Sequence, residues 1–222
     1  MLSPTPSTAT FINPASSRSE MSAKDDKNIL AVPREKLFAE GEFEGFMPAS
    51  KEYLSRISAH GKFLRRGDLE EDPSYKQAIP YVCVIHGKRL LVYERASDTQ
   101  HAHESRLHGL VSIGVGGHVD VDDGKEPKHA ILNALRRELH EEIGTHADMC
   151  ELIGYINLED TSVSKVHFGL LYLAHTSGTV RKGAEFSAME FLSLEECDRR
   201  FAEAQVEEWS RIAYEQIRDL LT

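Results

Sequence analysis

The sequence has few cysteines: Cys83, Cys150 and Cys197 are the only three in 222 residues. Their number is odd and none forms a Cys-x-x-Cys pair, so neither a disulfide framework nor a zinc motif is supported. Thiols that stay reduced are typical of the cytosol. We therefore expect a cytoplasmic protein.

Long apolar runs are also missing. No segment approaches the roughly 20 apolar residues that a membrane-spanning helix needs. Cations are outnumbered, with 26 Lys and Arg against 36 Asp and Glu, which gives a formal net charge of -10. This balance gives no electrostatic reason to expect binding to a nucleic-acid polymer or an anionic membrane surface. We expect a water-soluble protein.

The first 27 residues contain many Ser, Thr and Pro and few large apolar side chains. Such a composition cannot bury enough surface to offset the entropy of ordering, so residues 1–27 are predicted to form a disordered tail. The tail lacks the apolar segment of a secretory signal, and only its Ser-rich, acid-poor start favours an organelle transit peptide. Residues 28–78 are predicted to form an N-terminal extension packed on the main domain, and their basic run 62–66 is interpreted as a solvated edge rather than a phosphate-facing patch.

From Ile79 onward the sequence becomes richer in apolar and β-branched residues. Two apolar, β-branched runs flank His86-Gly87-Lys88, which is a hairpin signal. Further predicted strands cover residues 110–117, 150–158, 166–175 and 189–194, and predicted helices cover 127–143, 194–204 and 206–221. Strands around a central helix, with more helix at the end, indicate an α+β domain over residues 79–222.

The central helix is delimited by its ends. Pro127 suits the first helical position and Gly144 suits the C-terminal cap, with no helix breaker between them. Four apolar residues recur at helical spacing and predict one buried stripe: Leu132, Leu135, Leu139 and Ile143.

Three glutamates, Glu138, Glu141 and Glu142, lie near the end of this helix. Steps of three and four residues place them side by side, where each like-charged pair costs about 0.2–0.5 kcal/mol in an isolated helix. One interpretation is a solvated acidic face, which is what most charge runs are. The other is a cradle for a hard dication such as Mg²⁺, which prefers oxygen ligands and shares them with substrate phosphates. Spacing alone does not decide between the two.

With the glycines at 116 and 117 upstream, the run "RRELHEEIG" resembles the Nudix box of the Nudix (MutT-like) hydrolases. That box reads Gly, five residues, Glu, seven residues, then Arg-Glu-aliphatic-x-Glu-Glu-x-Gly-aliphatic. Its C-terminal half is matched here by Arg137, Glu138, Leu139, Glu141, Glu142 and Gly144, with Thr145 in place of the final aliphatic residue.

The N-terminal half of the box departs from the family pattern. Gly117 to Arg137 is a step of 20 (137 minus 117), where the family spacing gives 14, so six residues are extra. In the family pattern the first box glutamate lies eight residues before the arginine. Counting back eight residues from Arg137 reaches His129 (137 minus 129), and the nearest glutamate is Glu126. Glu126 or His129 therefore takes the place of the first box glutamate, and we choose Glu126.

The resemblance covers roughly residues 79–195 and implies a Nudix-like mixed β-sheet sandwich with helices packed against it. It implies a hydrolase that cleaves a diphosphate linkage in a nucleoside diphosphate-linked or similar organic substrate, with Mg²⁺ or alternatively Mn²⁺ as cofactor. It makes Glu138, Glu141 and Glu142 metal ligands, places Glu142 and Arg137 among the catalytic residues, and gives Arg137 the task of orienting a glutamate. A homodimer through the N-terminal region or the edge strands is compatible with the sequence.

Members of the family often take one more glutamate, as a metal ligand or general base, from a loop before a late strand. Glu185 is the candidate here, against the alternative of a plain surface residue. Candidate substrate contacts are Arg95, Gly116, Gly117 and His118, where Arg95 could equally form a salt bridge and the glycines could serve the turn alone. Trp209 is predicted to pack in the core with Ile212, Ile217 and Leu220 rather than to stack on a base.

Two other functions stay open. A catalytically inactive Nudix-like ligand-binding or regulatory domain would account for the lengthened box, although it gives no reason to keep three repelling glutamates. A diphosphate isomerase of the same fold would need a nucleophilic cysteine in the cleft. Cys83 and Cys150 lie in apolar strand patterns, which are typical of buried small hydrophobes.

Overall fold

The computed structural model describes residues 25–96 and 109–221, so most of the predicted tail lies outside the described residues. The strands are β1 (Asn28–Pro33), β2 (Gly45–Pro48), β3 (Lys62–Arg65), β4 (Tyr75–His86), β5 (Arg89–Arg95), β6 (Val111–Ser112), β7 (Gly114–Gly116), β8 (Met149–Asn157), β9 (His167–His175) and β10 (Phe186–Leu192). The helices are α2 (Arg34–Leu37), α3 (Lys51–His60), α4 (Arg66–Leu69), α5 (Pro127–Ile143), α6 (Leu194–Glu203) and α7 (Glu208–Leu221), with 3-10 turns η2 (Val121–Asp123) and η3 (Ser164–Val166).

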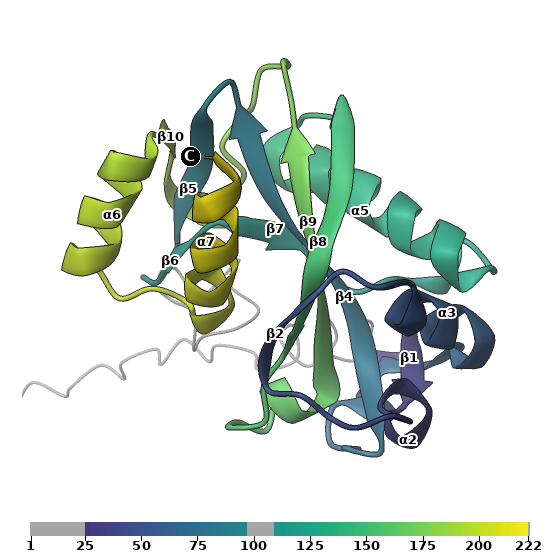
Figure 1. Cartoon of the computed structure of the whole chain (residues 1–222). Coiled ribbons are helices and arrows are strands. Elements are labelled where there is room, and N and C mark those ends of the chain that lie inside the picture. The colour runs from purple at the N-terminus through teal and green to yellow at the C-terminus, as the bar shows by residue number, and fades with distance from the viewer. Residues whose placement is uncertain (1–24, 97–108, 222) are drawn as a thin grey trace, which may run out of the picture.

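The strands form one mixed sheet in the order β10-β5-β4-β9-β8-β2 (Figure 1). The central pair β4 and β9 is parallel, and the other neighbouring pairs are antiparallel. β4 and β5 are joined through Gly87, whose φ of 63° is a left-handed value that glycine adopts without strain. The predicted α+β fold and the predicted hairpin are confirmed.

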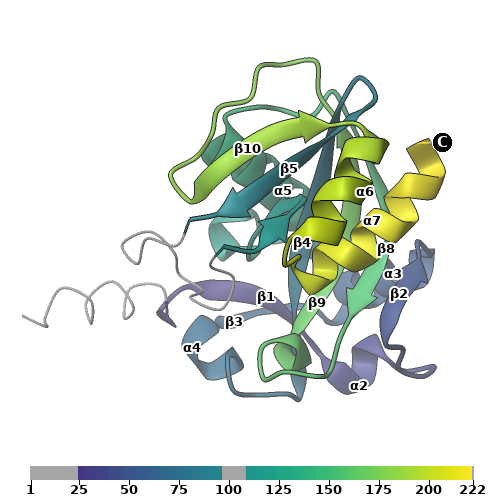
Figure 2. The same cartoon turned by 90° about the vertical axis from the view of Figure 1, so that its left-hand side faces the viewer.

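The short apolar strand segments of the sequence are buried on both faces of this sheet. Along β4, Val82 and Val84 belong to one core cluster, whereas Cys83 and Ile85 belong to another. Successive strand residues point to opposite faces, so a strand between two cores is apolar throughout. α5 covers the first face, and α6 with α7 covers the second (Figure 2).

Residues 28–70 join the same sheet rather than forming a body of their own. β1 pairs with both β3 and the start of β4, and β2 extends the opposite edge by pairing with β8. The predicted strand before the hairpin accordingly begins earlier than Ile79, at Tyr75, because β1 pairs with it there.

α5 runs from Pro127 to Ile143 and ends at Gly144, whose φ is 64°, so both predicted ends are confirmed. The predicted stripe needs one correction, because Leu132 is only half-buried. The face against the sheet is formed by Ala130, Ile131, Ala134, Leu135, Leu139 and Ile143. Small alanines allow the helix axis to approach the sheet, which the spacing of large side chains alone did not reveal.

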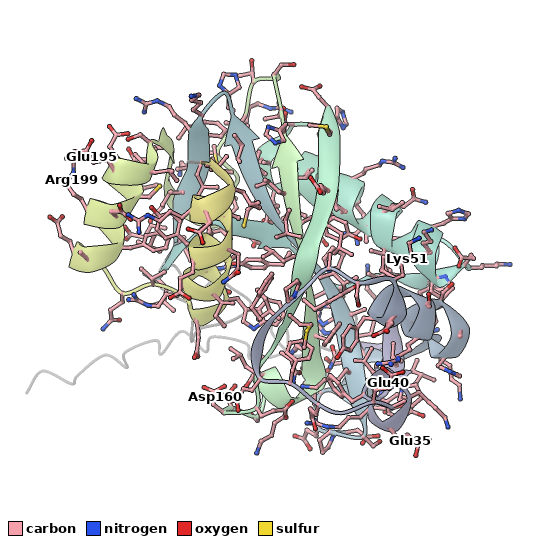
Figure 3. The ribbon with its side chains drawn as sticks, viewed as in Figure 1. Glu35, Glu40, Lys51, Asp160, Glu195 and Arg199 are labelled. Carbon is pink, nitrogen blue, oxygen red and sulfur yellow. The ribbon has the colours of Figure 1, made fainter. Side chains whose placement is uncertain are left out.

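Lys76 fixes the loop between β8 and β9. Its side chain is fully buried, and its Nζ donates to Glu159 Oε1 at 2.7 Å and to the carbonyl of Ser164 at 3.0 Å. Asp160, at the lower end of the molecule in Figure 3, lies on this loop and accepts a hydrogen bond from Ser164 Oγ. The loop is thereby held as one wall of the cavity described below.

None of the described helices is long and apolar enough to cross a membrane.

Candidate active site

A cavity of about 730 Å³ opens between the C-terminal half of α5, the bend after β7, the loop before β10 and the start of α7. The structure brings to this cavity every residue predicted to be catalytic, metal-binding or substrate-binding: Arg95, Gly116, Gly117, His118, Arg137, Glu138, Glu141, Glu142 and Glu185. These residues come from four separate stretches of chain, so their convergence is a result of the fold.

The three box glutamates differ sharply in exposure. The side chain of Glu141 is 59% exposed and that of Glu138 only 12%. Glu142 is deeper still, and its Oε2 is buried without a hydrogen-bond donor among the described residues. Burial raises the pKa of Glu138 and raises that of Glu142 to about 8. A solvated acidic face would show neither burial nor raised pKa values, so that interpretation fails for two of the three.

The raised pKa of Glu142 predicts a pH-dependent stability. A glutamate in an unfolded chain titrates near 4.3, so between roughly pH 4.3 and 8 the folded metal-free protein keeps a proton that the unfolded chain has released. The free energy of unfolding contributed by this group should therefore fall as pH rises through that window. Urea midpoints in chelator at about pH 5 and pH 9 measure it, with Glu142→Gln as reference. If the urea midpoint changes equally between the two pH values in the wild type and in Glu142→Gln, the expectation is contradicted.

Arg137 is held by the carboxylate of Asp123, which was not among the site residues predicted from the sequence. Its Nε and Nη2 donate to the two oxygens of Asp123 at 2.8 and 2.9 Å, a bidentate pair, and Nη2 also donates to the carbonyl of His118 at 3.0 Å. Its Nη1 donates to Glu138 Oε1 at 2.7 Å. Arg137 thus connects the bend after β7 to Glu138, and the Asp123 side chain is only 5% exposed.

The choice of Glu126 for the first box glutamate is wrong, and His129 does not fill the place either. Glu126 caps the N-terminus of α5 by accepting from the His129 amide, and the His129 side chain is 76% exposed. Counting forward from Gly117 by six (123 minus 117) reaches Asp123, so the sequence did carry the signal. All six extra residues therefore lie between Asp123 and Arg137, where they lengthen the entry to α5.

Gly117 lets Glu138 approach the backbone. A Cβ placed on Gly117 would lie 2.5 Å from Glu138 Oε1, and one on Gly116 would lie 1.9 Å from the carbonyl oxygen of Pro80. Gly116 therefore serves the packing of β7 on β4, and Gly117 serves the position of the glutamate.

Gly117→Ala should displace Glu138 and lower turnover about tenfold or more, the usual range for losing an outer-shell support. A double-mutant cycle with Glu138→Gln checks the cause, because residues that act through one contact are not additive. If alanine at 117 costs as much in the Glu138→Gln background as in the wild type, it does not act through Glu138.

Glu185 is placed opposite Glu142 by the loop before β10. The amide of Arg181 donates to the carbonyl of Ile143 at 2.8 Å, and Gly183 packs so closely that a Cβ there would lie 2.4 Å from the carbonyl oxygen of Glu142. Glu185 lines the cavity, and its negative charge contributes to the raised pKa of Glu142. The alternative of a plain surface residue does not fit this position.

Arg95 brings a buried cation into the cavity. Its Nη2 lies 3.4 Å from the Tyr93 hydroxyl, and its Nε is buried without a hydrogen-bond acceptor among the described residues. It forms no ion pair within residues 25–96 and 109–221, so the salt-bridge alternative does not hold there. Its positive charge interacts with the carboxylates of Glu207 and Glu142.

His118 faces the same cavity. Its Nε2 lies 2.7 Å from Gln77 Oε1 and 3.3 Å from Nε2 of His167, which also lines the cavity. Arg66 lines it as well, so the basic run 62–66 is not entirely a solvated edge.

The donor set fits a hard dication. Glu138, Glu141, Glu142 and Glu185 offer carboxylate oxygens, which Mg²⁺ and Mn²⁺ prefer, and a cation would satisfy the buried Oε2 of Glu142. No three His, Cys, Asp or Glu side chains of the described chain are close enough to chelate an ion without rearrangement. Mg²⁺ keeps several waters, so the ligands need not all touch it.

All three thiols are free, and none lines the cavity within the described residues. Cys83 is buried as expected, but the expectation for Cys150 is wrong: it is exposed near the start of β8. The isomerase alternative therefore lacks the cysteine that it requires.

The model of the NUDIX domain family matches residues 76–216. Protein YmaB of Bacillus subtilis is 36% identical over 157 residues, which span 67% of this chain and 75% of YmaB. The crystal structure of Tm1382, a candidate Nudix hydrolase, is similar with a TM-score of 0.75 and 36% identity over 87% of this chain and 100% of that one. The NUDIX domain of Shewanella oneidensis NrtR, solved with ADP ribose, shares the fold with a TM-score of 0.50 at 17% identity over 66% of this chain and 89% of that one.

Proposed function

Because this chain belongs to the Nudix family and is a hydrolase of that family, we propose that it cleaves a diphosphate linkage in a nucleoside diphosphate-linked or similar organic substrate, with Mg²⁺ or Mn²⁺. The observation that carries the proposal is the pair of buried glutamates, Glu138 and Glu142, facing Glu185 and Arg95 across one cavity. Glu138 already has Arg137 as a cationic partner, whereas the buried Oε2 of Glu142 has no donor among the described residues. A buried carboxylate without a cationic partner is costly, so a site that keeps Glu142 is suited to a cation.

Glu138, Glu141 and Glu142 would hold the metal, which when bound supplies charge neutralisation for the diphosphate and polarisation of the scissile P–O bond. Arg137 keeps Glu138 in place through its 2.7 Å hydrogen bond, and is itself held by Asp123. The net charge of -10 is offset locally by the guanidinium of Arg95, whose free Nε can donate to a phosphate oxygen.

Proton transfer falls to the glutamates on either side of the cavity. Glu185 is the proposed general base that takes the proton of the attacking water, and Glu142, which lines the same cavity, is the alternative. A base must lie within hydrogen-bond reach of that water, and Gly183 and Arg181 set this reach by docking the Glu185 loop on the end of α5.

We place the protein in the cytoplasm, since Cys83, Cys150 and Cys197 are all free. Mass spectrometry of protein from cells lysed in an alkylating agent tests this placement, with all three cysteines expected to be alkylated. Recovery of disulfide-linked species would contradict it.

A substrate panel tests the proposed hydrolysis. The purified full-length chain with Mg²⁺ should release a phosphorylated product from at least one of ADP-ribose, dinucleoside polyphosphates, nucleotide sugars and nucleoside triphosphates. Release must stop on addition of a chelator and return with Mg²⁺ or Mn²⁺. A chain that binds these compounds but cleaves none, with either metal, supports the inactive ligand-binding domain instead.

A further inference from the structure

Trp209 packs against the core as predicted from the sequence, together with Ile212, but it also reaches the cavity. It is half-buried at the start of α7 and lines the cavity whose other end holds the glutamates. Its indole meets the Tyr81 ring edge-on, with ring centroids 5.5 Å apart, and it lies against Gly169 of β9. Ile217 of the same helix is fully buried, whereas Leu220 is exposed, so that predicted packing is only partly correct.

A carboxylate stands next to this aromatic pair. Glu207 lines the cavity, and its Oε2 accepts three hydrogen bonds, from Tyr81 Oη at 2.8 Å, Ser112 Oγ at 2.8 Å and Ser210 Oγ at 3.0 Å. None of the described side chains or amides donates to Oε1. Three hydroxyls fix the orientation of the carboxylate and leave one oxygen as an acceptor for a donor from outside the protein.

The aromatic end and the glutamate end are connected by one short strand. The Tyr81 ring packs on Gly114, where a Cβ would lie 2.0 Å from the ring, and Gly117 touches Glu138. Three residues of extended chain separate the two glycines, about 10 Å at the usual rise per residue. Arg95 lies between the ends, close enough for its charge to act on both Glu142 and Glu207. One elongated molecule can therefore reach from Trp209 past Arg95 to the glutamates.

We propose that Trp209, Tyr81 and Glu207 form a subsite for a flat aromatic heterocycle that carries an N–H donor, the chemistry of a nucleobase with an amino group. The ring would stack on the indole, and the N–H would donate to Oε1 of Glu207. An aliphatic group could fill the same space against Ile79 and Leu158, but it would leave the Glu207 oxygen desolvated and unpaired.

This inference deepens the proposed function, because it makes the substrate a nucleotide derivative, yet its test needs no turnover. Trp209 is the single tryptophan of the chain, so its fluorescence reports this subsite alone. In chelator, AMP should quench or shift the emission in a saturable way when excitation is at the red edge of the indole band. Ribose 5-phosphate, which lacks the base, should not. Equal responses to the two compounds, or none to AMP, would overturn the proposal.

A matched ligand tests the role of Glu207. Purine riboside 5′-monophosphate lacks only the amino group of AMP, and should bind about tenfold or more weakly, as expected for an unpaired buried acceptor. In Glu207→Gln the three hydroxyls retain the amide oxygen and turn the NH₂ group toward the cavity. This variant should lose the preference for AMP while its circular dichroism and unfolding midpoint stay near those of the wild type. An unchanged preference in the folded variant contradicts the role of Glu207.

Trp209→Ala, studied by calorimetry because the fluorophore is gone, should weaken AMP binding about five- to hundredfold, the usual range for losing a base-stacking ring. Trp209→Phe should recover part of the loss. The two proposals fail separately: AMP binding without hydrolysis of any diphosphate counts against the proposed activity, whereas hydrolysis with an unchanged KM in Trp209→Ala counts against the subsite.

Discussion

Glu142→Gln should lower kcat by about 10²–10⁴-fold, the range for losing a group that acts in proton transfer or charge stabilisation. Glutamine keeps the shape of the side chain but cannot carry the negative charge that a dication requires. The same change should stabilise the metal-free protein above about pH 8 by a few kcal/mol, because the neutral amide avoids ionising a buried carboxylate. Stopped assays with a substrate found in the panel, together with urea unfolding in chelator, measure both effects.

A lower kcat together with a higher free energy of unfolding distinguishes this prediction from simple damage to the fold. Glu195→Gln is a matched control: its side chain is 85% exposed on α6 and lies on the outer side of the molecule beside Arg199 (Figure 3). It should change neither kcat nor the pH dependence of stability. A Glu142→Gln protein with wild-type kcat would remove Glu142 from the catalytic machinery.

Asp123→Ala should destabilise the protein by about 2–3 kcal/mol and lower turnover about 10- to 100-fold. The change leaves the Arg137 guanidinium without its bidentate partner, and the hydrogen bond from the Asp120 amide to Asp123 is lost as well. The stability cost is set below that of a fully buried pair because Arg137 is about a third exposed. Thermal unfolding and steady-state kinetics measure the two losses.

Glu126→Ala is the control for this prediction, because the sequence pattern gave Glu126 the role that Asp123 has in the structure. Loss of the helix cap should lower the unfolding midpoint slightly and leave kcat unchanged. Asp123→Asn, which keeps an acceptor but not the charge, should fall between wild type and Asp123→Ala. The assignment fails if Glu126→Ala is the more damaging variant for turnover.

Local interactions explain why α5 was predictable from the sequence. Pro127 and Gly144 fix the two ends of the helix through their own backbone preferences, and steps of three and four residues place Glu138, Glu141 and Glu142 together whatever surrounds them. The hairpin at Gly87 depends in the same way on a few neighbouring residues. The family resemblance implied metal ligands in the same local way, because the matching residues lie in one short run, Arg137 to Gly144.

Contacts between distant parts of the chain could not be obtained in this way. Counting from Gly117 makes Asp123 a candidate, but only the bidentate contact shows that it is the carboxylate that Arg137 binds. Trp209 is a second example. Helical spacing predicts that it shares a helix face with buried residues, but it cannot predict that the cavity extends to that face.

By itself the sequence determined the helix and its three carboxylates, because these follow from backbone preferences and from the period of apolar residues. Only the tertiary structure decided which carboxylates are dehydrated. Glu141 and Glu142 are neighbours in the chain, yet one is largely exposed and the other is buried beneath the loop that carries Glu185. Burial depends on everything packed around a side chain, and the surroundings of Glu142 come from segments more than 40 residues away (185 minus 142).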